Sequence, residues 1–410
     1  MRDHGWMGLE KVFRFVLPTR LQIGPGVASH VGEQVRAFGR RALLVSDPGV
    51  VEAGVLEPLR QDLARAGVEC AVFSDVEPNP RVATVDRAVD AAAEHRADVL
   101  VAVGGGSVLD TAKAASAVIT HGGSVFDYEG EDRVPGPVIP LVALPTTSGT
   151  GSEVTSWAII TDTTRHYKMA LGSAFLAPRI AWVDPLLTTS LPPSATAGTG
   201  MDALTHAIEA FTARCSNPIT DGLALYAIEL TGAMLERAVG DGADVEARCG
   251  MSMASVIAGI AFGNADTAAV HSMAEALGGL LDVPHGLANA ICLPYVMRFN
   301  LPAVPEKTAR IGEALGLDTS SRPVNEAAMA TVEAIIDLRA RLGIPSMRSL
   351  GVTEDHIPRL ASIALLNLGN PDNPVDVNER VFTDLFREAL AQPDDVSAQT
   401  VHRSRDGGGG

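Results

Sequence analysis

The stretch DVLVAVGGGSVLDTAKAASAVIT, residues 98–120, decides the fold of the first half of the chain. Its first part is a run of apolar and β-branched residues that passes into three glycines, and its second part has helical character. A strand that is apolar on both sides belongs in a sheet whose two faces are covered. The stretch therefore predicts a buried strand running into glycines (98–107) and a helix over 108–120.

The same alternation of strand and helix surrounds this stretch. Further strands are predicted at 41–47, 68–76 and 138–147, and further helices at 51–67 and 81–97. Two β-like runs within 155–171 flank a TDTTR turn and predict a hairpin. Strands that alternate with helices indicate a parallel sheet with helices on both faces.

The pattern changes beyond residue 192, where strand signals nearly vanish. Alanine-, leucine- and glutamate-containing segments predict helices at 193–214, 217–239, 243–262, 264–280 and 285–299, with several more to about residue 391. We therefore expect an α/β domain over 10–192, an all-helical domain over 193–392 and a disordered tail over 393–410. A ligand cleft is expected between the two domains.

Composition limits the partners and the compartment. The net charge of −17 argues against a general nucleic-acid or anionic-membrane surface. The four cysteines are scattered without a CxxC pair, which fits a reducing compartment. We find no secretory signal and no run approaching 18 apolar residues, so the sequence predicts a cytoplasmic protein without a membrane segment.

Two loops of small residues follow predicted strands: GGGSVLDTAK (104–113) and PTTSGTGSEVT (145–155). Glycines let the backbone approach an anion, and the start of the following helix offers free N–H groups. Each loop alone could be a structural turn, but together they predict a phosphate-bearing ligand at the sheet edge. Asp47 ends another strand, where it could accept hydrogen bonds from a ribose diol or act as a turn or cap residue.

Candidate metal ligands lie in the helical half. In TGMDALTHAIEAF (199–211), Asp202 and His206 are one helical turn apart and share a face. His271 falls in a later helix, and His285 in VPHG starts the next one. Each of these residues alone is commonly an ion-paired or partly buried polar group. Together they supply the oxygen and nitrogen ligands of a catalytic metal site, for which iron, zinc, nickel and copper all remain open.

These motifs resemble the iron-containing (group III) alcohol dehydrogenases over about residues 12–390. The resemblance rests on GGGSVLDTAK, LPTTSGTGSEVT, TGMDALTHAIEAF, AFGNADTAAVHSMAEALGG and PHGLANAICLPYVMRFN. It implies a Rossmann-like N-terminal domain plus an all-α C-terminal domain, the architecture shared with dehydroquinate synthase-like proteins. It also implies NAD(H), a metal in the cleft and a homodimer or larger homo-oligomer. The implied metal ligands are Asp202, His206, His271 and His285. The implied cofactor contacts are Asp47, Asn79, Gly105, Gly106, Ser107, Asp110, Thr146, Thr147, Thr155 and Lys168.

The chain departs from this family at Glu275, where many members have a histidine one turn after the third ligand. We expect Glu275 to contact a substrate hydroxyl or relay its proton; the alternatives are a fifth ligand or a solvated surface glutamate.

The resemblance implies hydride transfer between NAD(H) and a small, polar alcohol or aldehyde, with Fe²⁺ as the first choice of metal and Zn²⁺ as the second. Alternatives on the same scaffold are a zinc-dependent polyol (glycerol-type) dehydrogenase, a dehydroquinate synthase-like lyase and a maleylacetate-reductase-like enzyme. The last works without metal, so the four candidate ligands disfavour it. A non-enzymatic binding protein is a further alternative.

Overall fold

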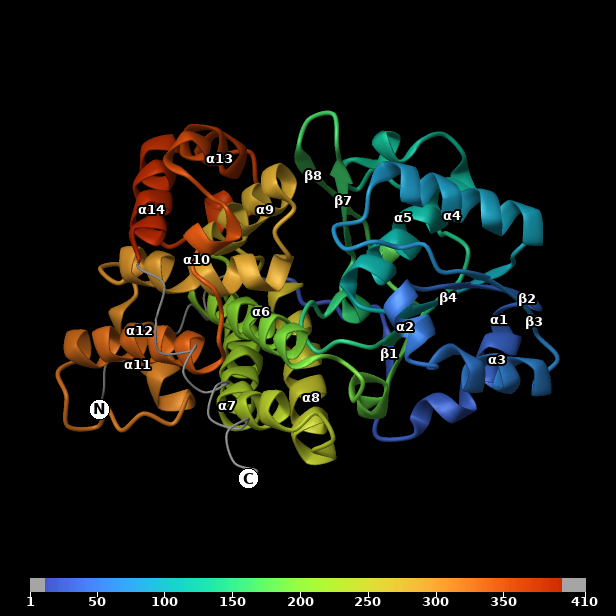
Figure 1. Ribbon diagram of the computed structural model, residues 1–410, viewed down its shortest axis with the longest axis horizontal. Coiled ribbons are helices and arrows are strands. Elements are labelled where there is room, and N and C mark those ends of the chain that lie inside the picture. Colours follow the sequence, from blue (N-terminus) through green and yellow to red (C-terminus); the bar gives the residue numbers. More distant parts are fainter. Residues whose placement is uncertain (1–11, 393–410) are drawn as a thin grey trace, which may run out of the picture.

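The computed structural model describes residues 12–392. Six parallel strands form its main sheet in the order β1-β9-β6-β4-β2-β3 (Figure 1). They are β1 (Arg20–Ile23), β2 (Arg41–Val45), β3 (Glu69–Phe73), β4 (Val99–Gly104), β6 (Leu141–Pro145) and β9 (Ile180–Val183). Every residue of β4 and β6 is buried. Their register pairs Gly104 with Pro145, so the two small-residue loops leave the sheet side by side.

Helices cover both faces of this sheet. On one face, α1 (Val31–Phe38) and α3 (Leu56–Arg65) pack with Val99 and Val101 of β4. On the other, α4 (Val82–His95) and α5 (Gly106–His121) pack with the alternate side chains of the same strand, such as Leu100. Successive side chains of β4 thus alternate between two separate cores. The predicted Rossmann-like architecture is confirmed.

Some predicted bounds were wrong. The single helix expected over 51–67 is divided into α2 (Pro48–Glu52) and α3, because Gly54 between them adopts a left-handed conformation (φ 73°). The helix expected from residue 264 begins only at Ala269, after an irregular segment. Strands β1 and β9, which have four residues each, were not predicted. The expected disordered tail at 393–410 lies outside the described residues.

A second, smaller sheet carries the predicted hairpin. Strands β7 (Trp157–Asp162) and β8 (Tyr167–Gly172) pair antiparallel, and β5 (Gly130–Glu131) extends the sheet beside β8. In Figure 1 this hairpin stands between the main sheet and α9. The backbone of α9 at Gly279 comes so close to the hairpin turn that an added Cβ would lie 2.8 Å from the carbonyl oxygen of His166. The hairpin therefore joins the two halves.

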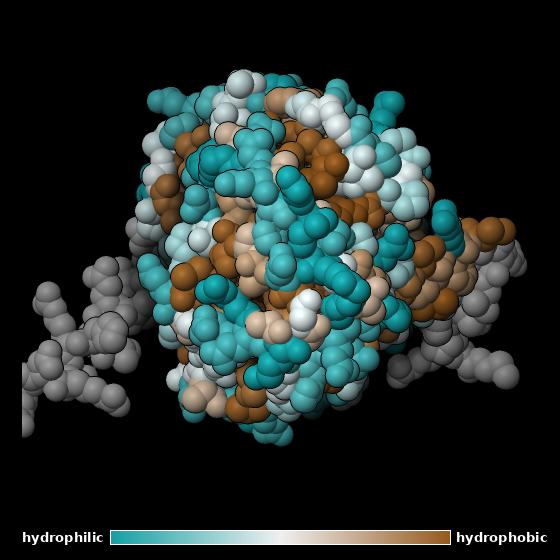
Figure 2. All heavy atoms as spheres, turned by 90° about the vertical axis from the view of Figure 1, so that its right-hand side faces the viewer, coloured by the Kyte–Doolittle hydropathy of each residue, from teal (hydrophilic) through white to brown (hydrophobic). Residues whose placement is uncertain are grey.

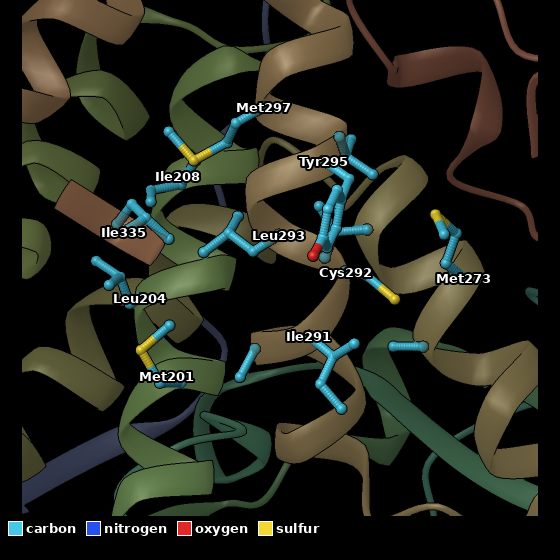
Figure 3. Close-up of a cluster of buried hydrophobic side chains, with 14 of the residues drawn as sticks. Met201, Leu204, Ile208, Met273, Ile291, Cys292, Leu293, Tyr295, Met297 and Ile335 are labelled. Carbon is cyan, nitrogen blue, oxygen red and sulfur yellow. The ribbon is translucent and has the colours of Figure 1, made fainter. Parts of the chain in front are cut away.

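Nine helices form the rest of the described chain (Figure 1). They are α6 (Pro193–Thr212), α7 (Pro218–Gly240), α8 (Val245–Phe262), α9 (Ala269–Leu281), α10 (His285–Asn300), α11 (Pro305–Ala314), α12 (Val324–Arg341), α13 (Ile357–Ala364) and α14 (Glu379–Ala391). Figure 3 shows their shared core, in which Leu204 of α6, Leu293 of α10 and Ile335 of α12 lie near one another. This core fixes how α6, α9 and α10 are placed.

One helix of the second half has the length and composition of a membrane-spanning segment. Among the described helices, α8 alone is long and apolar enough to cross a membrane by length and composition, and 56% of that window is buried inside the protein. It packs against α6 and α7, as a core helix does. The outer end of the α/β domain is largely hydrophilic, with separate apolar patches (Figure 2).

Two glycines let the domains approach closely. Gly151, in the loop after β6, faces Gly259 in the last turn of α8; a Cβ added to Gly259 would lie 2.9 Å from the Cα of Gly151. Gly151 also has a positive φ of 59°. The contact is therefore largely backbone against backbone, and the side chain of Val154 is also close, 2.7 Å from a Cβ added to Gly259.

We predict that Gly259→Ala destabilises the protein although alanine is the better helix former. The new methyl group must push the loop and α8 apart, and such overpacking costs about 1–3 kcal/mol. Gly222→Ala in α7 is the matched control, because nothing lies within 4 Å of its added Cβ. It should be neutral or stabilising by about 0.5–1 kcal/mol. Denaturant titration measures both free energies of unfolding, and equal stability of the two variants would contradict the prediction.

Candidate metal and cofactor site

Three helices bring the four candidate ligands together. Asp202 and His206 lie in the middle of α6, His271 is near the start of α9, and His285 is the first residue of α10. Their ligand atoms all lie within 4.8 Å of one another. Asp202, His206 and His271 are buried, and His285 is half-buried.

The spacing of these atoms fits a small cation. The Nε2 atoms of His206 and His271 are 3.0 Å apart, and Oδ1 of Asp202 lies 3.6 Å from Nε2 of His285 and 3.9 Å from Nε2 of His271. Two ligand atoms bound to one tetrahedral zinc ion are about 3.4 Å apart. A buried carboxylate facing three imidazoles is the donor set that divalent transition metals prefer.

Burial keeps two of the histidines neutral. It lowers the pKa of His206 to about 3 and the pKa of His285 well below its usual range. A neutral imidazole has a free lone pair on one nitrogen, which a metal ligand requires. The residues therefore fit a resident divalent metal.

Two neighbours of the ligands were not found from the sequence. Glu209 of α6 accepts hydrogen bonds from Nδ1 of His271 and from the backbone N–H of Val270. Asn289 lies one turn after His285, and its side-chain nitrogen is 2.7 Å from Oδ1 of Asp202. The signal was available for both, since each is one helical turn from a ligand on the same helix.

The cluster borders a cleft of about 610 Å³ between the domains. Of the predicted metal ligands, His206, His271 and His285 line it, whereas Asp202 lies deeper. Phe262 of α8 also lines it and stacks on the ring of His206 with centroids 4.1 Å apart. The cluster of candidate ligands is thus closed by helices on one side and open to the cleft on the other.

The predicted cofactor residues fall into two groups. Those that line the cleft are Asn79, Gly106, Ser107, Asp110, Thr155 and Lys168. The others, Asp47, Gly105, Thr146 and Thr147, are placed outside its lining. Asp47 follows β2, which neighbours β4, and its carboxylate caps α2 by accepting from the N–H of Val50. Burial raises the pKa of Asp47 above its usual value.

Gly106 shapes the turn between β4 and α5. A Cβ added there would lie 2.5 Å from the side chain of Thr150 in the second small-residue loop. The two loops therefore touch through a glycine, which leaves the backbone of the α5 N-terminus exposed to the cleft. This terminus has no side-chain cap, so its free N–H groups can receive a phosphate.

Asn79 links Lys168 to the helical half of the protein. Lys168 donates to the side-chain oxygen of Asn79 at 2.7 Å, and the Asn79 amide donates to Asp282 at 2.8 Å. Asn79 and Lys168 belong to the α/β half, whereas Asp282 ends α9. Burial lowers the pKa of Lys168, and the charges of Glu275 and Asp110 partly restore it.

A buried lysine that was not singled out from the sequence holds the second loop. Lys113, the last residue of GGGSVLDTAK and part of α5, donates to Ser152, Thr155 and the carbonyl of Trp157. Burial lowers its pKa to about 8 although Asp110 and Glu153 oppose this. Asp110 itself accepts from the hydroxyl of Ser152 and the N–H of Ile159, so its carboxylate has structural partners.

Glu275 lines the same cleft one turn after His271. Its carboxylate accepts a hydrogen bond of 2.6 Å from Asn367. Burial raises the pKa of Glu275, while the charges of Lys168 and His271 counteract that shift.

Comparison with known proteins agrees with this architecture. The family description "Iron-containing alcohol dehydrogenase" matches residues 18–185, and "Fe-containing alcohol dehydrogenase family, C-terminal" matches residues 196–390. A choline dehydrogenase of Bacillus subtilis (strain 168) is 43% identical over 390 residues, which cover 93% of this chain and 96% of that protein.

Two further relatives cover nearly the same span. An NAD-dependent methanol dehydrogenase of Bacillus methanolicus is 38% identical over 92% of this chain and 99% of its own. The crystal structure of a 1,3-propanediol oxidoreductase superposes with a TM-score of 0.90, at 40% identity, over 92% of this chain and 100% of that chain. The chain therefore belongs to the iron-containing alcohol dehydrogenase family, and it is a metal-dependent oxidoreductase that uses NAD(H).

Proposed function

We propose that this protein interconverts small, polar alcohols and their aldehydes, with Asp202, His206, His271 and His285 holding a divalent metal, first of all Fe²⁺. One observation carries the proposal: three of these ligands face the same cleft as the uncapped start of α5 and Lys168. A metal held there supplies a Lewis acid that polarises the oxygen of the alcohol or carbonyl. The polypeptide binds and orients the two reactants.

Different residues of the cleft are proposed to bind the cofactor and the substrate. The turn at Gly106 and the α5 N-terminus receive the cofactor phosphates, and the hydrogen bond from Lys168 to Asn79 holds these two side chains in the lining of the same cleft. Phe262 beside His206 keeps water from the reacting atoms. The helical side also presents Asp266, Glu275 and Asp372. A substrate with an additional hydroxyl or a positive charge suits this wall better than a plain alkanol.

The names of the relatives support that substrate class. Choline and 1,3-propanediol each carry a polar group beside the reacting alcohol, and proteins named for them are among the similar ones. An assay of choline, 1,3-propanediol, methanol and their aldehydes with NAD(H) tests the proposal. Absence of turnover on all of them in the metal-loaded enzyme would contradict it.

We also propose a cytoplasmic homodimer or larger homo-oligomer. Its support is the exposed apolar segment 12–17, in which Val12, Phe13, Val16 and Leu17 are accessible. This segment precedes β1, the edge strand of the main sheet. A second copy of the chain would cover such an edge.

Removal of the metal should abolish turnover. We expect about one divalent ion per chain, loss of activity after treatment with a chelator and recovery when a single metal is added back. His271→Ala should weaken metal binding at least tenfold, because three ligands hold the ion less well than four. Metal analysis together with the activity assay measures this. Full activity in a metal-free preparation would contradict the four-ligand site.

Asp47 should set the preference for NADH over NADPH. Its charge would repel a 2′-phosphate, and its free oxygen could accept from the ribose diol. Asp47→Asn keeps an acceptor for the N–H of Val50, so α2 stays capped. We expect the ratio of kcat/KM for NADH over NADPH to fall at least tenfold, about 1.4 kcal/mol. A native enzyme that prefers NADPH would show the assignment of Asp47 to be wrong.

Glu275→Ala should keep its metal and lose activity on polar substrates. We expect kcat/KM to fall about tenfold on the best polar alcohol and less on simple aldehydes, because the lost contact is to the polar group. Leu368→Ala, also in the cleft wall, is the matched truncation without loss of a carboxylate. Loss of metal from Glu275→Ala would identify a fifth ligand, and unchanged kinetics would identify a solvated glutamate.

A further inference from the structure

Glu209 occupies a position that links a metal ligand to a helix end. It lies on α6 one turn after His206, and only 3% of it is exposed. One carboxylate oxygen accepts from the backbone N–H of Val270 at 2.7 Å, and the other lies 2.5 Å from Nδ1 of His271. Both oxygens therefore have a donor from α9.

The first of these contacts caps a helix. Val270 is the second residue of α9, and the N-cap position, Ala268, makes no side-chain capping bond. The first N–H groups of a helix have no partner within it, and the helix dipole favours a negative charge there. The buried charge of Glu209 is thus compensated at the start of α9 without a basic side chain.

The second contact decides which nitrogen of His271 carries the proton. A carboxylate only accepts hydrogen bonds, so the facing Nδ1 atom is the protonated one. In the neutral ring the Nε2 atom then keeps its lone pair, and it points to the cluster, 3.0 Å from Nε2 of His206 and 3.9 Å from Oδ1 of Asp202. The Nε2 atom of His271 is therefore the nitrogen that is available to bind a metal.

We infer that Glu209 is a positioning residue that locks His271 in the Nδ1–H tautomer and aims its Nε2 atom at the metal. The inference rests on the proposed metal site. A carboxylate behind a histidine ligand makes the imidazole a better donor and fixes the angle of its ring. Glu209 also ties the start of α9 to α6, so that the candidate ligands of the two helices keep their relative positions.

The variant Glu209→Gln separates this role from simple packing. Glutamine has nearly the same shape, but its amide offers only one acceptor oxygen. If that oxygen takes the N–H of Val270, the amide NH₂ faces Nδ1 of His271 and requires a lone pair there. The imidazole proton must then move to Nε2, where it blocks the metal. In the reverse orientation the tautomer is kept, but the amide NH₂ then faces the N–H of Val270. Two donors repel each other there, so the start of α9 and the ring of His271 are displaced, and zinc binding is weakened in this case too.

The test measures zinc affinity by competition with a chromophoric chelator. We expect Glu209→Gln to bind Zn²⁺ about 10- to 100-fold more weakly than the wild-type protein. NADH binding to the metal-free proteins, followed by fluorescence, should agree within about twofold, since Glu209 does not line the cleft. Glu236→Gln is the matched control: this glutamate lies on α7 and pairs with Arg341 at the surface. It should retain wild-type zinc affinity.

A second measurement uses the wild-type protein alone, so it remains decisive if the glutamine variant does not fold. Nitrogen-15 NMR of histidine-labelled, zinc-loaded protein should show, among the metal-bound imidazoles, one set of signals with a protonated Nδ1 and a metal-bound Nε2 that is absent in His271→Gln. Unchanged zinc affinity in Glu209→Gln, or a His271 ring protonated at Nε2, would overturn the inference. A wild-type protein that binds neither Zn²⁺ nor Fe²⁺ would instead refute the proposed metal site itself.

Discussion

The burial of one carboxylate and three imidazoles between α6, α9 and α10 is the constraint on which the rest of the structure depends. Removing such groups from water costs several kcal/mol per charge unless partners replace the solvent. The partners here come from the same three helices: Asn289 donates to Asp202, and Glu209 accepts from His271. The apolar core around Leu204 and Leu293 then only has to hold these helices in register (Figure 3).

Helix α6 illustrates how one element meets several demands. Nearly all its residues from Thr196 to Phe211 are buried, because α7, α8 and α10 surround it. A helix that is apolar on every side has to lie inside the protein. Its few polar residues therefore stand out, and each of Asp202, His206 and Glu209 has a partner in the site. The polar exceptions in an otherwise apolar helix carried most of the functional information in the sequence.

Local patterns predicted the fold well wherever an element buries a regular face. The strand predicted at 98–107 and the helices of the second half have such faces. Their predicted positions agree with β4 and α6–α10 to within a few residues, apart from the start of α9. Strands β1 and β9 are too short to show a period, and their pairing across the sheet depends on residues far apart in the sequence. The division of α2 from α3 depended on a single backbone angle at Gly54, which the surrounding helical pattern concealed.

The site shows a similar limit. The four candidate ligands could be named from residue types and a family resemblance, and the structure brings them together. Glu209 and Asn289 could have been noticed because each lies one turn from a candidate ligand on the same helix. Their contacts, like those of Lys113, form between helices or loops and could not be predicted from local sequence. Lys113 is the clearest example. Its ammonium group is buried, and removing its three hydrogen bonds would require repacking of the loop that holds Ser152 and Thr155. That loop carries Gly151 against Gly259 of α8. The cofactor side and the metal side of the cleft are therefore connected through one short segment whose geometry neither domain determines alone.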